Sequence, residues 1–414
     1  MSRWQIVGLS LNDVIGSGVY LLPAAAAAVL GTFSLWAVLV AGLAVMLIVL
    51  CFAECSSYFD EPGSAYLYAR TAFGDFIGFQ VGWMTWLARV SSVASLSVGF
   101  AQALSYAWPE VESGWPRGLA ITIPLIMLTA LNIVGVKSGV RTAVVLLVSK
   151  LIPLLVFVGA GLIAVSWETF SAQPAGDGQL GGAALLLLFA YAGFENTPAA
   201  AGEFHNPRRD VPFALLVNIG VVTVLYFLVQ GIALATLPNV GDSLTPLADA
   251  ADSFLGSWAG WLLTIGGALS ILGTNSNTVF AGPRYLYALA RDGFGPAFLA
   301  RIHPRFRTPA AAVIFQAVVA LPLALSGSFV QLAALSVIAR LATYLGTVAA
   351  VPVLRRKFAH VEGGFRVPGG PLIPIAGGLI TVGLAASAGR SNLEAGAIAL
   401  GIGLVIFTLR RRSV

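Results

Sequence analysis

Charged side chains are scarce in this sequence of 414 residues. They make up 10% of the chain, whereas hydrophobic residues make up 58%. An ordinary soluble domain carries roughly 25% charged residues. Such a low charge content excludes a sizeable water-soluble domain and indicates that lipid surrounds most of the chain. We therefore expect residues 1–414 to form a single transmembrane domain.

Cysteine and histidine are also rare. Cys51 and Cys55 lie one helical turn apart in an apolar run, without the spacing of metal ligands, and are interpreted as small core residues. The only histidines, His205, His303 and His360, fall in short polar connections, which excludes an imidazole relay inside the apolar runs. An intramembrane enzyme would need such a base or a motif such as HExxH. We expect no enzyme activity, no metal and no cofactor.

Long apolar runs are abundant, and each is long enough for a membrane-spanning helix of about 20 residues. Helices are expected because irregular or open-sheet backbone cannot satisfy its polar groups in hydrocarbon. The sequence predicts an all-α membrane protein with about twelve transmembrane helices. The predicted spans are 4–29, 33–56, 76–107, 119–136, 142–166, 181–203, 212–236, 257–288, 310–325, 329–353, 372–388 and 393–409.

The basic residues between these spans are distributed unequally. With the N-terminus inside, only Arg117 and Arg390 lie outside. This positive-inside bias predicts an even number of spans and cytoplasmic termini, in a multi-pass protein of the plasma (inner) membrane. The basic loops are expected to contact lipid headgroups and not nucleic acid. The predicted inner residues are Arg3, Arg70, Lys137, Arg141, Arg208, Arg209, Arg284, Arg291, Arg301, Arg305, Arg307, Arg355, Arg356, Lys357, Arg366, Arg410, Arg411 and Arg412.

Two spans are interrupted by glycine-rich polar sequence. The first contains Ile15-Gly16-Ser17-Gly18, and the sixth contains Ala192-Gly193-Phe194-Glu195-Asn196. Each of these spans begins a block of five helices, and an odd number of helices reverses the topology of the second block. The breaks therefore predict inverted repeats with discontinuous helices one and six. The predicted repeats are 4–166 and 181–353, with 372–409 as an appendage.

A broken helix exposes N–H groups with partial positive charge and carbonyls with partial negative charge. We expect the first break to bind a carboxylate through the backbone of Ile15, Gly16, Ser17 and Gly18. The carbonyls of Phe189, Ala190 and Ala192 would bind the ammonium group of the same amino acid. The alternative for Gly-Ser-Gly is a small-residue surface for close helix packing.

Lys150 lies in the middle of the fifth predicted span. An ionisable residue at this depth is costly and marks a functional site by default. Because burial disfavours the charged form of a lysine, Lys150 is the candidate for proton coupling. The alternative is a fixed ammonium that permanently binds carbonyls of the unwound first helix.

Four further ionisable residues, Asp13, Arg89, Glu195 and Arg340, fall within predicted spans. Opposite charges that pair would reduce the cost of burial, but the sequence does not show which pairs form. Glu195 lies in the break of helix six, where its carboxylate could bind a cationic substrate side chain or exchange a proton. The alternative is an N-cap for the second half-helix.

Several motifs in order along the chain resemble the amino acid-polyamine-organocation superfamily of transporters. The resemblance implies five-plus-five inverted repeats, alternating access and amino-acid binding at the two unwound segments. It also implies that the fifth-helix lysine replaces a sodium ion, which disfavours sodium coupling. The motifs are Ile15-Gly16-Ser17-Gly18-Val19-Tyr20, Ala53-Glu54-Cys55-Ser56-Ser57, Pro62-Gly63-Ser64-Ala65-Tyr66, Asn132-Ile133-Val134-Gly135-Val136-Lys137, Phe189-Ala190-Tyr191-Ala192-Gly193-Phe194-Glu195, Asn206-Pro207-Arg208-Arg209-Asp210-Val211-Pro212 and Pro283-Arg284-Tyr285-Leu286-Tyr287-Ala288-Leu289-Ala290-Arg291-Asp292-Gly293.

The sequence thus predicts a secondary active transporter that moves amino acids by alternating access in proton-coupled symport. A basic amino acid or polyamine exchanger is the alternative, and a non-transporting amino-acid sensor with the same fold is a more remote one. The side-chain preference, the stoichiometry and the oligomeric state are not readable from the sequence.

Overall fold

A computed structural model describes residues 2–61, 63–135, 140–165, 180–359 and 364–411. Within these ranges the chain forms helices joined by turns and contains no β-strand. The predicted all-α fold is therefore confirmed. The span ends predicted at residues 136 and 166 lie outside the described residues, as does His360.

Ten of the twelve predicted spans are single helices in the described part of the chain. Eight segments there are long and apolar enough to cross a membrane. The ten helices are α3 (Ser34–Ser57), α5 (Asp75–Leu104), α6 (Gly114–Val134), α7 (Val140–Ala164), α10 (Pro207–Thr236), α12 (Ser257–Arg291), α13 (Ala310–Ser326), α14 (Phe329–Lys357), α15 (Leu372–Ala386) and α16 (Arg390–Arg411).

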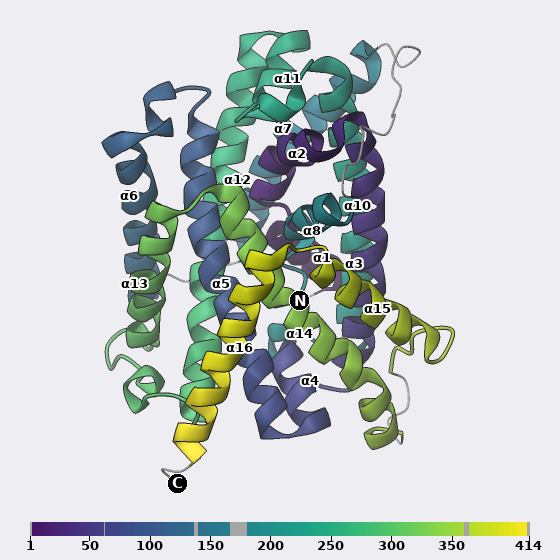
Figure 1. Ribbon diagram of the computed structural model, residues 1–414, viewed down its shortest axis with the longest axis vertical. Coiled ribbons are helices and arrows are strands. Elements are labelled where there is room, and N and C mark those ends of the chain that lie inside the picture. Colours follow the sequence, from purple (N-terminus) through teal and green to yellow (C-terminus); the bar gives the residue numbers. More distant parts are fainter. Residues whose placement is uncertain (1, 62, 136–139, 166–179, 360–363, 412–414) are drawn as a thin grey trace.

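The other two predicted spans are broken, as expected. Span one consists of α1 (Arg3–Val14) and α2 (Ser17–Leu30), and span six consists of α8 (Leu180–Tyr191) and α9 (Asn196–Ala199). The order of elements then repeats. A broken span is followed by a long helix and a short one, α4 (Ser64–Phe73) in the first block and α11 (Pro246–Leu255) in the second. These short helices lie at opposite ends of the molecule, as an inverted repeat requires (Figure 1).

Short 3₁₀ segments occupy some of the connections. They are η1 (Gly31–Phe33), η2 (Pro109–Glu112), η4 (Ala201–Glu203), η5 (Val240–Asp242) and η6 (Ala297–Ala300).

The start of α10 differs from the prediction. The helix begins at Pro207, not at residue 212, because a proline in the first turn lacks only an N–H that would have no helical partner there. Pro212 lies inside the same helix. Pro212 therefore does not mark the start of α10.

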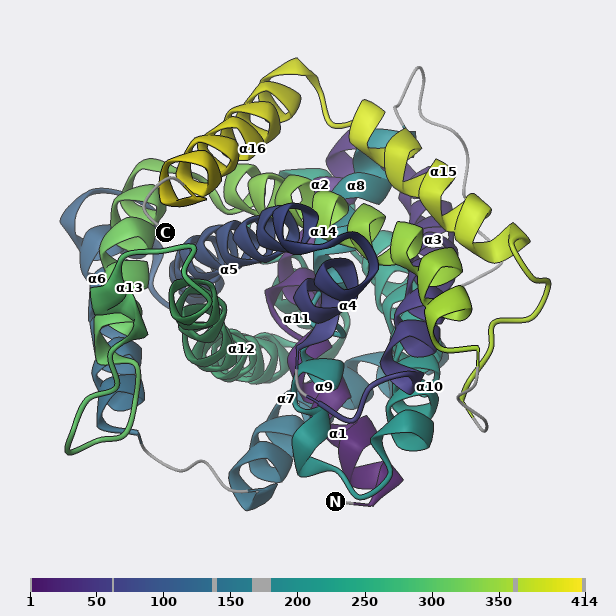
Figure 2. The ribbon, with the colours of Figure 1, turned by 90° about the horizontal axis from the view of Figure 1, so that it is seen from below.

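Three long helices form the centre of the bundle. α5 packs extensively on both α12 and α14, and α3 pairs with α10 beside them. Figure 2 shows α5, α12 and α14 around the middle and α6, α13, α15 and α16 at the periphery. The last two helices contact α3, α5, α8 and α14 from outside.

α15 is shorter than its predicted span. Its 15 residues correspond to about 22 Å of helix at ~1.5 Å per residue, less than the roughly 30 Å of hydrocarbon in a bilayer. In Figure 1 the turn between α15 and α16 lies near mid-height of the bundle. The two helices diverge from this turn and lie along the outside of the bundle (Figures 1 and 2).

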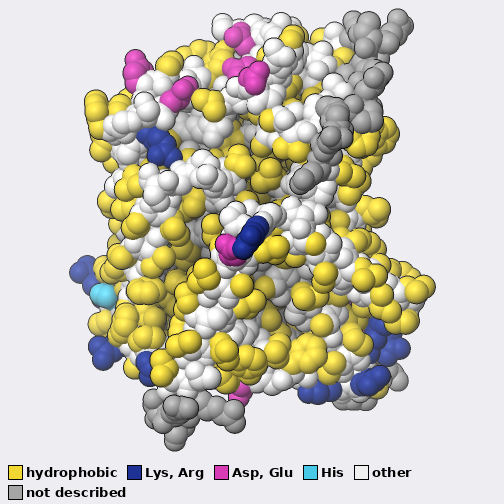
Figure 3. Space-filling model, viewed as in Figure 1, with side chains coloured by type: hydrophobic (Ala, Val, Ile, Leu, Met, Phe, Trp, Pro, Cys, Tyr) yellow, Lys and Arg dark blue, Asp and Glu magenta, His cyan; other side chains and the backbone are white. Residues whose placement is uncertain are grey.

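The surface is apolar around the middle and charged at the ends. Leu43, Ile123, Ile163 and Leu379 are among the large hydrophobic side chains more than half exposed. Figure 3 shows hydrophobic atoms over most of one face, with Lys and Arg gathered at the end that holds α4. We call this the basic end. An apolar middle with polar ends is the surface expected of a multi-pass integral membrane protein.

Candidate functional site

The first break places the end of α1 against the start of α2. Ile15 is extended, with ψ of 100°, and α2 begins at Ser17 without a side-chain cap. The first N–H groups of α2 thus have no helical carbonyl to bind and carry the positive end of the helix dipole. The buried hydroxyl of Ser17 also has no hydrogen-bond partner.

The second break is a tight turn between α8 and α9. The N–H of Ala192 donates to the carbonyl of Phe189 at 3.2 Å, and the N–H of Asn196 donates to Gly193 at 3.0 Å. Gly193 has φ of +127°, a conformation that L side chains rarely adopt. The glycine therefore allows the backbone to leave the helical conformation between the two half-helices.

The two breaks touch each other through glycine. A Cβ atom on Gly18 would lie 2.4 Å from the Cα of Ala190, and one on Gly193 would lie 2.5 Å from the carbonyl oxygen of Asp13. Neither distance is compatible with a side chain. The close-packing interpretation thus holds for Gly18, in addition to any role of this segment in binding.

Lys150, on α7, reaches the end of α1. Its Nζ donates to the carbonyl oxygens of Asn12 at 2.9 Å and Ile15 at 2.7 Å. The hydroxyl groups of Ser270 and Thr274 on α12 also donate to Ile15, at 3.2 and 3.3 Å. The lysine is fully buried. The structure therefore brings the predicted coupling residue to the first break, where it binds carbonyls that the interrupted helix leaves without helical donors.

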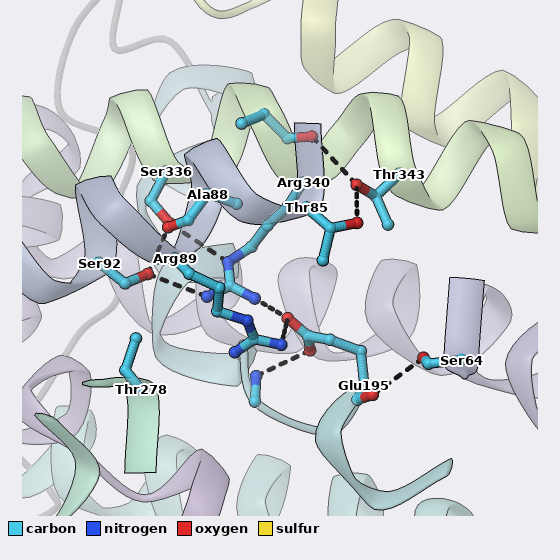
Figure 4. A network of polar contacts seen from close by, with 12 residues as sticks. Ser64, Thr85, Ala88, Arg89, Ser92, Glu195, Thr278, Ser336, Arg340 and Thr343 are labelled. Carbon is cyan, nitrogen blue, oxygen red and sulfur yellow. Dashed lines mark hydrogen bonds and ion pairs between the residues drawn. The ribbon is translucent and has the colours of Figure 1, made fainter. Parts of the chain in front are cut away.

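Glu195 lies between two arginines (Figure 4). Its Oε1 atom forms an ion pair with Arg340 on α14 and lies 3.4 Å from Nη2 of Arg89 on α5. Its Oε2 atom accepts from the N–H of Gly193 at 2.9 Å. Glu195 occupies the N-cap position of α9, but its carboxylate makes no capping hydrogen bond to that helix. The intramembrane pairs that the sequence left open are therefore Arg89 and Arg340 with Glu195.

Asp13 has a different kind of partner. Its Oδ1 atom accepts from the amide nitrogen of Asn277 at 2.7 Å, and no cation lies within ion-pair distance of it among the described residues. An amide donor satisfies the carboxylate without cancelling its charge.

A cavity lies between the breaks. It encloses about 410 Å³ of empty space, counting its open side. Side chains and backbone from both broken spans, α5, α12 and α14 line it. The residues are Asp13, Val14, Gly16, Ser17, Gly18, Arg89, Ser92, Leu96, Phe189, Ala192, Gly193, Asn196, Thr274, Asn277, Thr278 and Arg340.

Most of the predicted substrate-binding residues reach this cavity. Gly16, Ser17, Gly18, Phe189 and Ala192 are part of its lining. The structure places the other three, Ile15, Ala190 and Glu195, differently.

Those three residues lie outside the lining and have protein partners. The carbonyl of Ile15 binds Lys150, Ser270 and Thr274, and Glu195 binds the two arginines. The carbonyl of Ala190 accepts from the hydroxyl of Tyr226 at 3.0 Å. The Ala190 carbonyl, which was expected to bind the ammonium group, therefore already accepts one hydrogen bond from a neighbouring side chain.

The contribution of α12 to the cavity was not predicted from the sequence. Thr274, Asn277 and Thr278 line the cavity, and all three lie in one polar run, Thr274-Asn275-Ser276-Asn277-Thr278, within an otherwise apolar helix. That run was the available signal. Polar residues at membrane depth face the bundle interior or a cavity because lipid cannot satisfy them.

Comparisons with known proteins agree with this architecture. The profile of the family described as "Amino acid permease" matches residues 1–405. The branched-chain amino acid permease BcaP of Bacillus subtilis is 28% identical, and the match covers 100% of this chain and 93% of the relative. The methylthioribose transporter of the same organism is 29% identical, with 91% and 85% covered. Its serine/threonine exchanger SteT is also 29% identical, with 89% and 86% covered. Together, the broken helices, the cavity between them and a match over nearly the whole length show that this chain belongs to the amino acid permease family.

Proposed function

We propose that this protein is a secondary active transporter that moves amino acids across the membrane by alternating access. The observation that supports this best is the pairing of two helix ends at one cavity. The start of α2 supplies N–H groups and the end of α8 supplies carbonyls, and residues of both line the cavity. Such a pair complements the carboxylate and ammonium groups of an amino acid.

The carboxylate of the substrate binds at Gly16, Ser17 and Gly18. The buried Ser17 hydroxyl without a partner adds a further donor at this position. The ammonium group binds the carbonyls of Phe189 and Ala192, whose residues line the cavity. The Phe189 carbonyl also accepts from the N–H of Ala192 and keeps a second lone pair, whereas Ala190 lies outside the lining and its carbonyl accepts from Tyr226. Two of the relatives bear the names of amino-acid substrates, and the third bears the name of methylthioribose.

Transport is coupled to protons in symport, with Lys150 as the coupling residue. Its ammonium group donates to the carbonyl oxygens of Asn12 and Ile15. A sodium ion would otherwise be able to bind these oxygens. This supports a sodium-independent mechanism. The blocks 4–166 and 181–353 are the two repeats whose relative movement alternates access, and the basic end faces the cytoplasm, with both termini, at the plasma (inner) membrane.

Uptake by purified protein in proteoliposomes tests this function. Each of the twenty amino acids is supplied with a radiolabel, with an inward proton gradient, in sodium and in sodium-free buffer. We expect at least one amino acid to accumulate equally in both buffers and to lose accumulation when a protonophore is added.

Three outcomes would contradict parts of the proposal. Sodium-dependent accumulation would refute proton coupling. Uptake only into vesicles preloaded with amino acid would show an exchanger, and competition by putrescine would assign polyamines to it. Absence of uptake and binding for all twenty amino acids would refute amino-acid transport.

A further inference from the structure

Arg89 differs from the other buried arginine of the site. Each of the three guanidinium nitrogens of Arg340 has a partner. Nη2 donates to Ser92 at 2.9 Å, Nε donates to Ser336 at 3.3 Å, and Nη1 pairs with Glu195. Arg89 has only its ion pair at 3.4 Å with the same carboxylate. Its Nε and Nη2 atoms are buried and have no hydrogen-bond partner among the residues that the structure describes.

The position of Arg89 is equally informative. The residue is 1% exposed, and it lines the cavity between the two broken helices. In Figure 4 the guanidinium groups of Arg89 and Arg340 lie next to each other, beside the carboxylate of Glu195. A buried guanidinium without hydrogen-bond acceptors is costly to maintain, because its donors have lost water without replacement. Because Arg89 lines the cavity, an acceptor bound there can reach its guanidinium.

The charges around the cavity do not balance. When Lys150 carries its proton, it is a third cation beside Arg89 and Arg340, whereas Glu195 and Asp13 are the carboxylates near them. Three cations against two anions leave one positive charge in excess. Asp13 is close enough to interact electrostatically with both Lys150 and Arg89, yet it pairs directly with neither.

Substrates of different charge have different consequences for this excess. A zwitterion with a neutral side chain leaves it unchanged, and a cationic side chain increases it. A side-chain carboxylate cancels it, and it can bind the planar fork of a guanidinium through two parallel hydrogen bonds. Uncompensated charge in a water-poor site is expensive, so the anionic side chain is favoured.

We propose that Arg89 binds the side-chain carboxylate of the substrate, and that the substrate class is the acidic amino acids. This inference rests on the proposed function and names its substrate. It replaces the expectation that Glu195 accepts a cationic side chain, since that carboxylate already binds two arginines and a backbone N–H.

Competition between isosteric amino acids tests the assignment. Binding of radiolabelled L-glutamate and L-aspartate to purified protein is compared with competition by L-glutamine, L-asparagine and L-lysine, with and without chloride. We expect the acidic member of each pair to bind on the order of ten- to hundred-fold more tightly than its amide. Two results would overturn the inference. One is equal or tighter binding of the amides, and the other is binding of a neutral amino acid only when chloride is present.

Variants locate the effect at Arg89. Arg89→Gln should lose most of the preference for glutamate over glutamine, whereas Arg89→Lys keeps the charge and should retain part of it. Arg390→Gln, at a 92%-exposed side chain on α16, is the matched control and should leave the preference unchanged. A glutamate preference that survives in Arg89→Gln would refute the role of this residue.

Two further measurements keep the test decisive. Size-exclusion profiles establish whether Arg89→Gln is folded. If this variant does not fold, the comparison of glutamate with glutamine binding in the unmodified protein still tests the substrate class. Transport of a neutral amino acid without binding of glutamate would refute the acidic substrate and leave the transporter intact. Binding of no amino acid at all would instead refute the proposed function.

Discussion

At the scale of single residues, Lys150 connects two parts of the site. It extends from α7 to the carbonyls of Asn12 and Ile15, at the point where the first helix is interrupted. An ammonium group can fill this position in two ways. It can bind and release a proton during transport, or it can remain charged and hold the end of α1 in place.

Arginine at position 150 separates these roles, because a guanidinium stays protonated under all conditions that proteins tolerate. We expect Lys150→Arg to retain exchange of labelled substrate across proteoliposomes but to lose accumulation driven by a proton gradient. Lys150→Ala should lose both, since it removes the side-chain donor of the buried Asn12 carbonyl, at a cost of about 1–3 kcal/mol, and one of three donors to the Ile15 carbonyl.

The control for this pair is Lys357→Arg, at an exposed position at the end of α14. It should accumulate substrate like the unmodified protein. Gradient-driven accumulation that persists in Lys150→Arg would show that Lys150 is a fixed structural cation.

At the scale of helices, the contact between the two broken spans is made by backbone. Gly18 near the start of α2 lies against the backbone of Ala190 in α8, and Gly193 lies against the last turn of α1. Tyr226 on α10 adds a hydrogen bond to the carbonyl of Ala190. The cavity keeps its shape because the four half-helices are in contact without intervening side chains.

Gly18→Ala should therefore disturb the site without changing any polar group. The added methyl group meets the backbone of Ala190 at 2.4 Å, so the helices must separate. Overpacking of this kind costs about 1–3 kcal/mol, and we expect a lower Tm in detergent together with a loss of substrate binding.

Gly220→Ala, within α10, is the matched control because nothing lies within 4 Å of the added methyl group. It should preserve binding and leave Tm unchanged or slightly higher, as expected for alanine in a helix interior. Normal binding by Gly18→Ala would show that the two breaks need not touch.

At the scale of the whole molecule, charge is distributed along the axis of the bundle. Arg291, Arg305 and Arg355 belong to the basic end, while Asp242 and Asp252 lie near α11 at the other end.

Ion pairs strengthen the basic end. Arg70 on α4 pairs with Asp292 after α12 at 2.5 Å, and Arg355 pairs with Glu54 at 2.6 Å. Tyr66 also donates to Asp292, and burial followed by this contact raises the pKa of its phenol above the usual value, so the hydroxyl remains a donor.

This distribution predicts the orientation in the membrane. Ser257→Cys, at the start of α12, should react with a membrane-impermeant maleimide applied to intact cells. Arg305→Cys, at the basic end, should react only after the membrane is opened. The native Cys51 and Cys55 are buried, so background labelling should be low. The reverse pattern would place the basic end outside.

Much of the architecture could be predicted from the order of residues. The apolar runs, the two glycine-rich interruptions and the basic connections determine a helical membrane bundle in which spans one and six are discontinuous. These features are local, since lipid requires each helix to satisfy its own backbone. The same reasoning located Gly16, Ser17, Gly18, Phe189 and Ala192, because a helix end is exposed wherever the helix is interrupted.

Only the tertiary structure decided which groups remain available. It assigned the Ala190 carbonyl to Tyr226, both arginines to Glu195, and Lys150 to the end of α1, and it brought a polar face of α12 to the cavity. These partners lie on helices far apart in the chain, and their selection depends on how the helices pack. The sequence by itself determined where the helices break, whereas packing determined which helix ends are satisfied by neighbours and which are left for a substrate.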